Sequence, residues 1–381
     1  METLWESRFA LRAQGMTSST IRELLKLTQK PEVISFAGGL PAAEYFPVER
    51  FQEACQRVLA QSAEQALQYG TTEGYLPLRE LIANRMQKQG ANVTADHILI
   101  TSGSQQALSL IGAMMLNVGD RVLVEQPTYL GALQAFLTYQ AQYVGVPTDD
   151  NGIITDKLPS ILRYGPKFMY ILPSFQNPAG ITISAERRAE LVKIALEYGV
   201  PIIEDDPYSE LRYEGDPLNP LIVYDAEMTK NGSDSYDGNV MYLSTFSKTL
   251  APGLRTAWVA GPPTALAKMT QLKQGADLHT STFNQMVMYE VAKDGYIDQH
   301  IDRLRGVYGK RRLTMLDALD EFMPEGIRWT RPDGGLFLWM FLPEGITSRA
   351  LFEAAIARDV AFVPGDAFYP DANPPSRARL N

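Results

Sequence analysis

The stretch Ser244-Thr245-Phe246-Ser247-Lys248-Thr249-Leu250-Ala251-Pro252-Gly253-Leu254-Arg255 decides the prediction of the fold. An apolar run, residues 240–243, precedes it and predicts a buried strand, and residues 256–260 predict a second one. Lys248 is therefore expected in a loop between two core strands and not on a solvated helix face. Burial disfavours the ammonium form and lowers its pKa, and a neutral amine is a nucleophile.

The side chains around Lys248 indicate what such an amine could bind. A neutral lysine can condense with an aldehyde to form a Schiff base. Thr245, Ser247 and Arg255 could hold a phosphate, the arginine through its planar fork. An aldehyde that carries a phosphate suggests pyridoxal phosphate. A surface lysine in a Ser/Thr-rich turn would have the same local sequence, so the rest of the chain has to decide.

Composition excludes several classes of protein. The 381 residues are 45% hydrophobic and 21% charged, which is typical of a globular protein with more than one core. The net charge of −9 argues against a nucleic-acid partner. One cysteine, Cys55, excludes an internal disulfide framework, and His97, His279 and His300 lack metal-ligand spacing, so we expect no metal. Without an apolar N-terminal core or a membrane-length run, we expect a cytoplasmic protein with no membrane partner.

Predicted strands and helices alternate from residue 98 onward. This alternation indicates an α/β fold whose central sheet is mostly parallel and has helices on both faces. The strands are expected at 98–101, 121–124, 142–146, 168–172, 200–203, 240–243 and 256–260, and the helices between them at 105–116, 130–140 and 185–198.

A second, smaller α+β domain is expected from the strands and helices that follow. A long helix at 297–319 precedes strands at 326–331 and 336–342, a helix at 348–358 and a strand at 361–363. We expect three parts. Residues 1–45 would form an N-terminal arm and a substrate-side helix that pack with the small domain, residues 46–280 the large cofactor-binding domain, and residues 281–381 a linking helix and the small C-terminal domain.

Polar residues follow several of these strands, where open α/β sheets bind ligands. Ser104 and Gln105 begin the helix after strand 98–101, and free amides at a helix start favour phosphate. Tyr129 could stack on a flat ring, and Asn177 could hydrogen-bond a phenolic oxygen. Taken singly, these residues could equally be an ordinary capping turn, core packing or an Asn-Pro turn.

An acidic run follows the strand predicted at 200–203. In Glu204-Asp205-Asp206, an aspartate could lie beside a pyridinium nitrogen and keep it protonated, although three acids in a row usually mark a solvated strand end. A dinucleotide cofactor is disfavoured, because no G-x-G-x-x-G follows a strand.

Taken together, these motifs resemble a known family over nearly the whole chain. The strings Asn177-Pro-x-Gly, Asp205-x-x-Tyr208 and Ser247-Lys248 to Arg255, in this order, resemble the fold-type I, pyridoxal-phosphate-dependent class I/II aminotransferases. The closest likeness is to the α-aminoadipate and kynurenine aminotransferase group. It is carried by Thr20-Ile-Arg-Glu-Leu-Leu, Phe36-Ala-Gly-Gly-Leu-Pro, Gln68-Tyr, Ser102-Gly-Ser-Gln-Gln-Ala-Leu and Pro173-Ser-Phe-Gln-Asn-Pro.

The resemblance implies a role for each matching residue. Lys248 would be the Schiff-base lysine and proton shuttle, and Asp205 would pair with the ring nitrogen. Asn177 and Tyr208 would bind the phenolic oxygen, and Tyr129 would stack on the ring. The phosphate would be bound by Ser104, Gln105, Thr245, Ser247 and Arg255. Tyr69 would reach the phosphate of the neighbouring subunit, which implies a homodimer. Arg379 and Asn177 would bind the α-carboxylate of the substrate, and Arg22 and Gly39 would lie beside its side chain.

The family chain normally continues past Arg-Leu-Asn by a strand and a helix, whereas this sequence ends at Asn381. Arg379 is therefore expected to lie at a fraying end, with weakened carboxylate binding, unless the sequence is incomplete.

The resemblance implies a transaminase that moves an α-amino group to a 2-oxo acid, with 2-oxoglutarate as the expected acceptor. Two alternatives stay open at this point. One is another pyridoxal-phosphate reaction, β-elimination or decarboxylation. The other is a ligand-sensing regulator, for which the roughly twenty residues before the helix cap at Thr20 are too few to form a DNA-binding domain. The sequence does not select the amino donor, nor does it tell whether the N-terminal segment moves.

Arg22 generates a prediction about side-chain selectivity. Thr20 and Glu23 match a capping box, which predicts a helix at 21–29 with Arg22 in its first turn. If Arg22 binds a distal carboxylate, Arg22→Ala should lower kcat/KM for glutamate or 2-aminoadipate by about ten- to a hundredfold, the equivalent of roughly 1.5–3 kcal/mol. Activity with leucine or phenylalanine should be nearly unchanged. Equal losses for both substrate classes would mean that Arg22 only shapes the helix.

Overall fold

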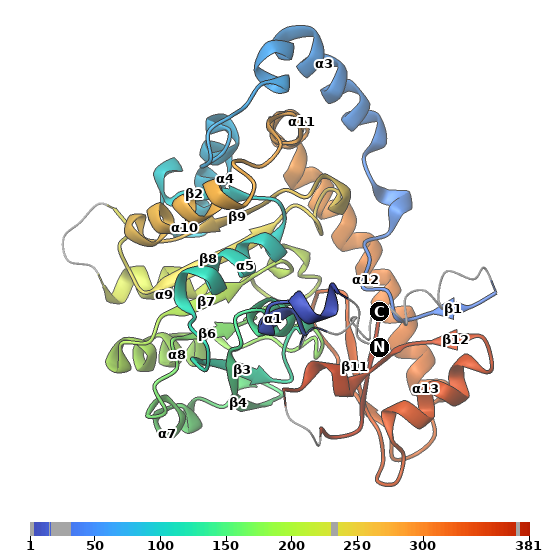
Figure 1. Ribbon diagram of the computed structural model, residues 1–381. Helices are drawn as coiled ribbons and strands as arrows, with labels where there is room; N and C mark the ends of the chain where they lie inside the picture. Colours follow the sequence, from blue (N-terminus) through green and yellow to red (C-terminus); the bar gives the residue numbers. More distant parts are fainter. Residues whose placement is uncertain (1–3, 15, 17–31, 230–234, 371–373) are drawn as a thin grey trace.

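The computed structural model describes residues 4–14, 16, 32–229, 235–370 and 374–381. Figure 1 shows a large sheet flanked by helices and, beside it, a smaller sheet formed by the C-terminal part of the chain. The helix predicted at 21–29, with the capping box and Arg22, lies outside the described residues. No helix in the described part of the chain is both long and apolar enough to cross a bilayer.

The central sheet has eight strands in the order β2-β9-β8-β7-β6-β3-β4-β5. The run β8-β7-β6-β3-β4 is parallel, while β9 is antiparallel to both of its neighbours and β5 is antiparallel to β4. The predicted α/β fold with a mostly parallel sheet is thus confirmed. The strands are β2 Ile98–Thr101, β3 Arg121–Gln126, β4 Gln142–Asp149, β5 Gly152–Ile153, β6 Phe168–Ile171, β7 Ile202–Asp205, β8 Val240–Thr245 and β9 Ala257–Ala260.

Helices cover both faces of this sheet, because successive strand side chains point to opposite sides. In β6, Phe168 and Tyr170 pack on one face and Met169 and Ile171 on the other. The first face is covered by α5 (Ser104–Met115), α6 (Leu130–Leu137) and α10 (Pro263–Ala276). The second is covered by α4 (Leu76–Lys88), α7 (Leu158–Leu162), α8 (Ala185–Tyr198), α9 (Leu221–Met228) and α11 (Thr282–Ala292).

The small sheet is antiparallel, in the order β10-β11-β14-β13. The 27-residue α12 (Tyr296–Phe322) leads from the large sheet to this part, as Figure 1 shows. Its strands are β10 Arg328–Trp329, β11 Leu338–Phe341, β13 Val363–Pro364 and β14 Arg377–Leu380, and α13 (Ser348–Ile356) packs beside them. A parallel pair, β1 (Ile34–Ser35) with β12 (Val360–Ala361), joins the N-terminal segment to it.

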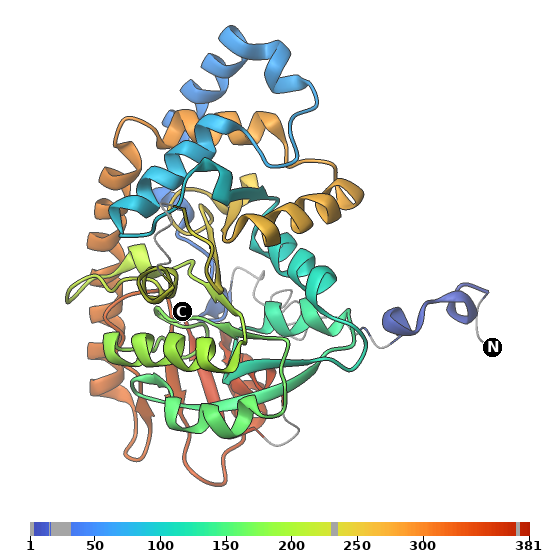
Figure 2. The same ribbon diagram turned by 90° about the vertical axis from the view of Figure 1, so that its left-hand side faces the viewer.

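Two further helices lie near the start of the chain. Helix α3 (Val48–Leu67) packs against α11 and extends beyond the sheet at the top of Figure 1. Helix α1 (Leu11–Gln14) lies on an exposed arm that projects away from the body in Figure 2.

Two predicted strand boundaries and one prediction about the end of the sequence change in ways that affect the site. The strand expected at 200–203 is β7, Ile202–Asp205, so Asp205 ends the strand and does not follow it. The strand expected at 361–363 is divided between β12 and β13, which belong to different sheets. The expectation that Arg379 frays is wrong. It lies in β14, paired with β11 on one side and β13 on the other, and is only 4% exposed.

Candidate active site

A cavity of about 400 Å³ lies at the edge of the sheet where the parallel strands end. The carboxyl ends of β7, β8 and β2 meet at this edge because the three strands run in the same direction. β7 and β8 are parallel, and β2 and β8 are both antiparallel to β9, which lies between them. Arg22 lies outside the described residues, and Tyr69 is not among the residues that line this cavity. The other predicted site residues line it: Gly39, Ser104, Gln105, Tyr129, Asn177, Asp205, Tyr208, Thr245, Ser247, Lys248, Arg255 and Arg379.

Lys248 follows β8, in the loop that leads back to the antiparallel strand β9. Its Nζ donates a 3.2 Å hydrogen bond to the carbonyl oxygen of Gly39 and lies 5.9 Å from the ring centroid of Tyr208. The side chain is half-buried and lines the cavity. Burial, and then the positive charges of Arg379 and Arg255, lower the pKa of Lys248 to about 8. A sizeable share of this amine is therefore neutral in mildly alkaline solution.

Asp205 presents one unpaired carboxylate oxygen in this cavity. Its Oδ2 accepts a 2.6 Å hydrogen bond from the hydroxyl of Tyr170, while Oδ1 is buried and has no hydrogen-bond partner among the described residues. Burial raises the pKa of Asp205 to about 7, although the Tyr170 bond opposes the shift. A cationic N–H beside Oδ1 would stabilise the charged form.

The acidic neighbours of Asp205 face the other side of β7 and have structural roles. Glu204 accepts hydrogen bonds from the backbone N–H groups of Leu221 and Ile222, at 2.7 and 3.0 Å, and so caps α9. Asp206 accepts a 3.1 Å bond from the hydroxyl of Tyr242. The structure thus separates one carboxylate for the cavity from two that hold the fold.

The phosphate ligands expected from the sequence come together from two loops. Ser104 opens α5 after the glycine turn, and its buried Oγ has no hydrogen-bond partner within the described part of the chain. From the Lys248 loop, Thr245 Oγ1 donates to Ser247 Oγ at 2.8 Å. A Cβ on Gly103, whose φ is +86°, would lie 2.2 Å from Nη2 of Arg255, so the guanidinium packs directly on this turn. Hydroxyls, a helix N-terminus and a guanidinium form a suitable anion site.

Arg379 is held at the other part of the cavity by three kinds of contact. Its Nη1 donates to Asn177 Oδ1 at 2.9 Å and its Nη2 to the carbonyl oxygen of Ala37 at 2.8 Å. Its guanidinium carbon lies 4.5 Å from the ring centroid of Phe337 and 5.2 Å from that of Phe368. Burial lowers the pKa of Arg379 to about 10, so it stays a cation at neutral pH.

The bond from Arg379 also orients the Asn177 amide. Because a guanidinium only donates hydrogen bonds, the amide oxygen must face Arg379. The amide nitrogen of Asn177 is left as a donor near the hydroxyl of Tyr208. The pair can therefore donate to a phenolic oxygen, as predicted.

Two orphaned polar atoms test whether pyridoxal phosphate suits this site. Ser104 Oγ lacks an anion to bind and Asp205 Oδ1 lacks a donor. Pyridoxal phosphate carries both missing partners, a phosphate and a ring N–H, together with an aldehyde for Lys248. The residues present fit this cofactor.

The structure also adds site residues that the sequence reasoning missed. Tyr170 orients Asp205, and Phe337 forms the wall beneath Arg379 and against Gly39. The signal for Tyr170 was a hydroxyl within an otherwise apolar buried strand. Tyr69, by contrast, lies outside the cavity; it is 78% exposed and its ring centroid is 5.8 Å from that of His279.

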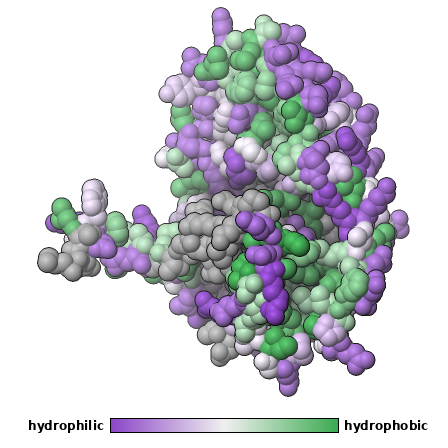
Figure 3. Space-filling view, turned by 90° about the vertical axis from the view of Figure 1, so that its right-hand side faces the viewer, coloured by the Kyte–Doolittle hydropathy of each residue, from purple (hydrophilic) through white to green (hydrophobic). Residues whose placement is uncertain are grey.

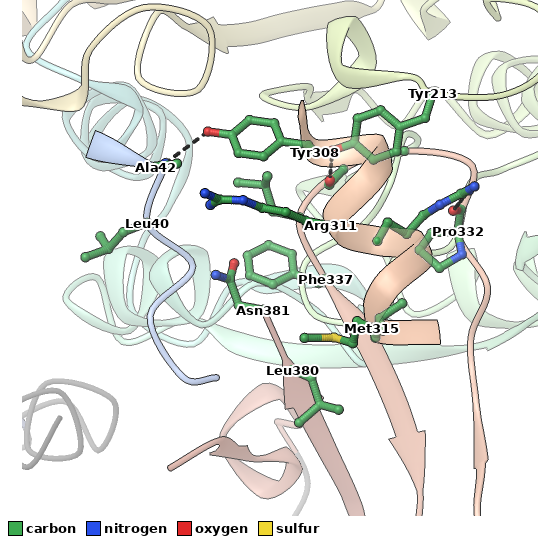
Figure 4. A pocket seen from close by; sticks show the side chains of 15 residues that line it. Leu40, Ala42, Tyr213, Tyr308, Arg311, Met315, Pro332, Phe337, Leu380 and Asn381 are labelled. Carbon is green, nitrogen blue, oxygen red and sulfur yellow. Dashed lines mark hydrogen bonds between the residues drawn. The ribbon is translucent and has the colours of Figure 1, made fainter. Parts of the chain in front are cut away.

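A second cavity, of about 220 Å³, lies beside the first and shares Leu40 and Phe337 with it (Figure 4). In Figure 4 the hydroxyl of Tyr308, on α12, accepts a 3.0 Å hydrogen bond from the backbone N–H of Ala42. Its arginines, Arg311 and Arg312, are paired with Glu44 and Glu214. The predicted site residues that the structure describes do not line this second cavity, and all of them except Tyr69 line the first.

Comparison with known proteins agrees with this geometry. The sequence matches the family Aminotransferase class I and II over residues 31–381. It is 46% identical to aromatic-amino-acid aminotransferase 1 of Thermococcus litoralis, with 99% of this chain and 90% of the relative covered. It is 44% identical to 2-aminoadipate transaminase of Thermus thermophilus, with coverage of 99% and 92%.

A solved structure shows the same fold. Kynurenine aminotransferase of Pyrococcus horikoshii, in complex with PMP, superposes with a TM-score of 0.92 at 44% identity, covering 99% of this chain and 93% of that one. The match to the family and the sequence identities to these relatives each cover nearly the full chain, and together they show the family. The chain belongs to the class I and II aminotransferases, and it is a pyridoxal-phosphate-dependent transaminase.

Proposed function

We propose that the protein transfers the α-amino group of 2-aminoadipate, glutamate, leucine or an aromatic amino acid to 2-oxoglutarate. The observation that carries this assignment is one cavity lined by a buried amine, a carboxylate with a free oxygen and a guanidinium: Lys248, Asp205 and Arg379. When bound, the cofactor supplies an aldehyde carbon for the amino group and a ring that accepts electrons from the substrate Cα.

The chain's own residues then have separate tasks. Arg379 binds the substrate α-carboxylate through its fork and so orients the Cα–H bond. Lys248 Nζ, whose pKa is lowered to about 8, would take the proton from the substrate Cα and deliver it to the aldehyde-derived carbon of the cofactor, on the other side of the amino nitrogen. Asp205 holds the proton on the ring nitrogen, while Asn177 and Tyr208 bind the phenolic oxygen.

The residues that line the cavity indicate which substrate side chains it can accept. Leu40, Leu130 and Phe337 are apolar lining residues, which suits leucine or an aromatic ring. An acidic side chain needs a cation there, and Arg22 is the proposed source. The names of relatives that act on aromatic, 2-aminoadipate and kynurenine substrates support such breadth.

A homodimer is the proposed assembly, with Tyr69 reaching the phosphate of the neighbouring subunit. Tyr69 is exposed, yet it is held at an edge-to-face angle by His279. The projecting arm carries exposed Leu4, Trp5 and Leu11. Figure 3 shows hydrophobic side chains mixed with hydrophilic ones along the arm. These features support a second copy as the partner. The cytoplasmic location and the domain boundaries remain predictions from the sequence.

A donor panel tests the reaction. Each amino acid is incubated with the holoenzyme and 2-oxoglutarate, and glutamate and the matching 2-oxo acid are quantified by chromatography. When glutamate is the donor, 2-oxoadipate replaces 2-oxoglutarate as the acceptor, and 2-aminoadipate and 2-oxoglutarate are quantified. We expect the two products in equal amounts for every accepted donor. Release of ammonia or carbon dioxide instead would identify a β-lyase or a decarboxylase, and the proposal would be dropped.

Lys248 should capture the cofactor in a pH-dependent reaction. Because the neutral amine attacks, the capture rate of the apoprotein should rise with pH around a midpoint near 8, the pKa of Lys248, and level off above it. Stopped-flow absorbance measures the rate. Borohydride reduction and peptide mapping should then place the pyridoxyl group on Lys248, and a label on another lysine would refute the assignment.

Asp205 should matter far more for turnover than its two acidic neighbours. Asp205→Ala should lower kcat by orders of magnitude while cofactor still binds, because the ring nitrogen loses the carboxylate that keeps it protonated. Glu204→Gln and Asp206→Asn are matched controls on the opposite face. They should lower thermal stability by about 1–3 kcal/mol at most, through weakened buried hydrogen bonds, with turnover per folded molecule retained. Near-normal turnover in Asp205→Ala would mean that another acid acts.

A further inference from the structure

An ion pair between a buried lysine and a partly exposed aspartate lies behind the turn that carries the proposed phosphate ligands. Lys273, on α10, is 0% exposed. Its Nζ donates to Asp277 Oδ1 at 2.8 Å, to Asp277 Oδ2 at 2.9 Å and to Gln106 Oε1 at 2.9 Å. An ammonium has three N–H donors, so each of them has an acceptor here. The group is fully bonded in spite of its burial.

The acceptors of Lys273 also hold the turn between β2 and α5. Gln106 Oε1 accepts a 2.7 Å bond from the backbone N–H of Ser102, and Gln106 Nε2 donates to Asp277 Oδ2 at 2.6 Å. The hydroxyl of Ser102 donates to the same Oδ2 at 3.1 Å and pairs with the hydroxyl of Thr280 at 3.2 Å. The backbone and the side chain of Ser102 are thus both anchored to one ion pair on α10.

The opposite side of this turn faces the cavity. Ser104 and Gln105 lie two and three residues beyond Ser102, and both line the cavity with Arg255. Gly103, between the anchor and the ligands, packs so tightly on Arg255 that a Cβ would overlap its guanidinium. A shift of Ser102 would therefore move the amide groups and the hydroxyl that face the phosphate.

The ion pair is an inefficient way to stabilise a fold, because the cost of burying the Lys273 ammonium offsets much of its attraction to Asp277, whose side chain is 28% exposed and screened by solvent. An apolar pair of similar volume would fill the same space. What the apolar pair could not do is hold the Ser102 hydroxyl and the Gln106 amide in one orientation. We propose that Lys273, Asp277 and Gln106 are positioning residues that fix the β2–α5 turn for the cofactor phosphate. This inference rests on the proposed phosphate site.

The test compares two ligands that differ only in the phosphate. The double variant Lys273→Met/Asp277→Leu removes both charges together and leaves no unpaired one, and Lys268→Met, an exposed lysine on the same helix, is the matched control. Affinities of the apoproteins for pyridoxal phosphate and for pyridoxal are measured by absorbance titration, and thermal unfolding of the apoproteins is recorded alongside. Ser102→Ala is the milder second variant, in case the double variant does not fold.

We expect the double variant to bind pyridoxal phosphate at least about tenfold more weakly while its affinity for pyridoxal stays the same. Ser102→Ala should show a smaller loss with the same selectivity, and Lys268→Met none. Equal weakening for both ligands, in parallel with a lower unfolding temperature, would reduce the network to a stabilising role and overturn the inference. Unchanged binding of both ligands would overturn it as well.

Arg255→Met separates this inference from the assignment on which it rests. Its guanidinium is part of the phosphate site itself, so its loss should also weaken pyridoxal phosphate selectively. If Arg255→Met has no such effect, the proposed phosphate site is wrong. If it does, and the variants at Lys273, Asp277 and Ser102 do not, only the positioning role fails.

Discussion

Among the described residues, three cationic side chains line the main cavity together with one carboxylate, and much of the site follows from this excess of positive charge. Lys248, Arg255 and Arg379 all line it, and Asp205 is the acid among the lining residues. Neighbouring positive charges make the protonated form of each group less stable and so lower its pKa. Of the three cations, the amine of Lys248 loses its proton most easily. This lining favours anions, which agrees with the proposed phosphate and carboxylate sites, and its positive charges help to lower the pKa of Lys248 to about 8.

The alternation of side chains along β7 gives the three consecutive acids Glu204, Asp205 and Asp206 different surroundings. Side chains alternate across a strand, so Glu204 and Asp206 point to one face and Asp205 to the other. On their face, the first two accept hydrogen bonds that cap α9 and fix Tyr242. On its own face, Asp205 is buried, held by Tyr170 and left with one free oxygen. Acidic side chains at three consecutive positions thus serve both the fold and the proposed chemistry.

The small sheet completes the site from a distant part of the sequence. Arg379 lies in β14, and the flanking strands β11 and β13 hold its backbone. Its side chain meets Asn177 from the large sheet and the carbonyl oxygen of Ala37 from the N-terminal segment. One guanidinium therefore joins three segments that are far apart in the chain, and any movement between the two sheets would shift it relative to Asn177 and the rest of the cavity.

Much of this could be predicted from the sequence alone. The alternation of apolar strands and helices indicated the central sheet, and the strings around Asn177, Asp205 and Lys248 indicated the cofactor, because local periodicity and short motifs record local geometry. Only the tertiary structure showed that Asp205 ends its strand, that Tyr170 and Phe337 belong to the site and that Arg379 does not fray. Strand pairing and cavity walls join residues separated by up to hundreds of positions, and the physical reason that the sequence missed them is that such contacts leave no local pattern.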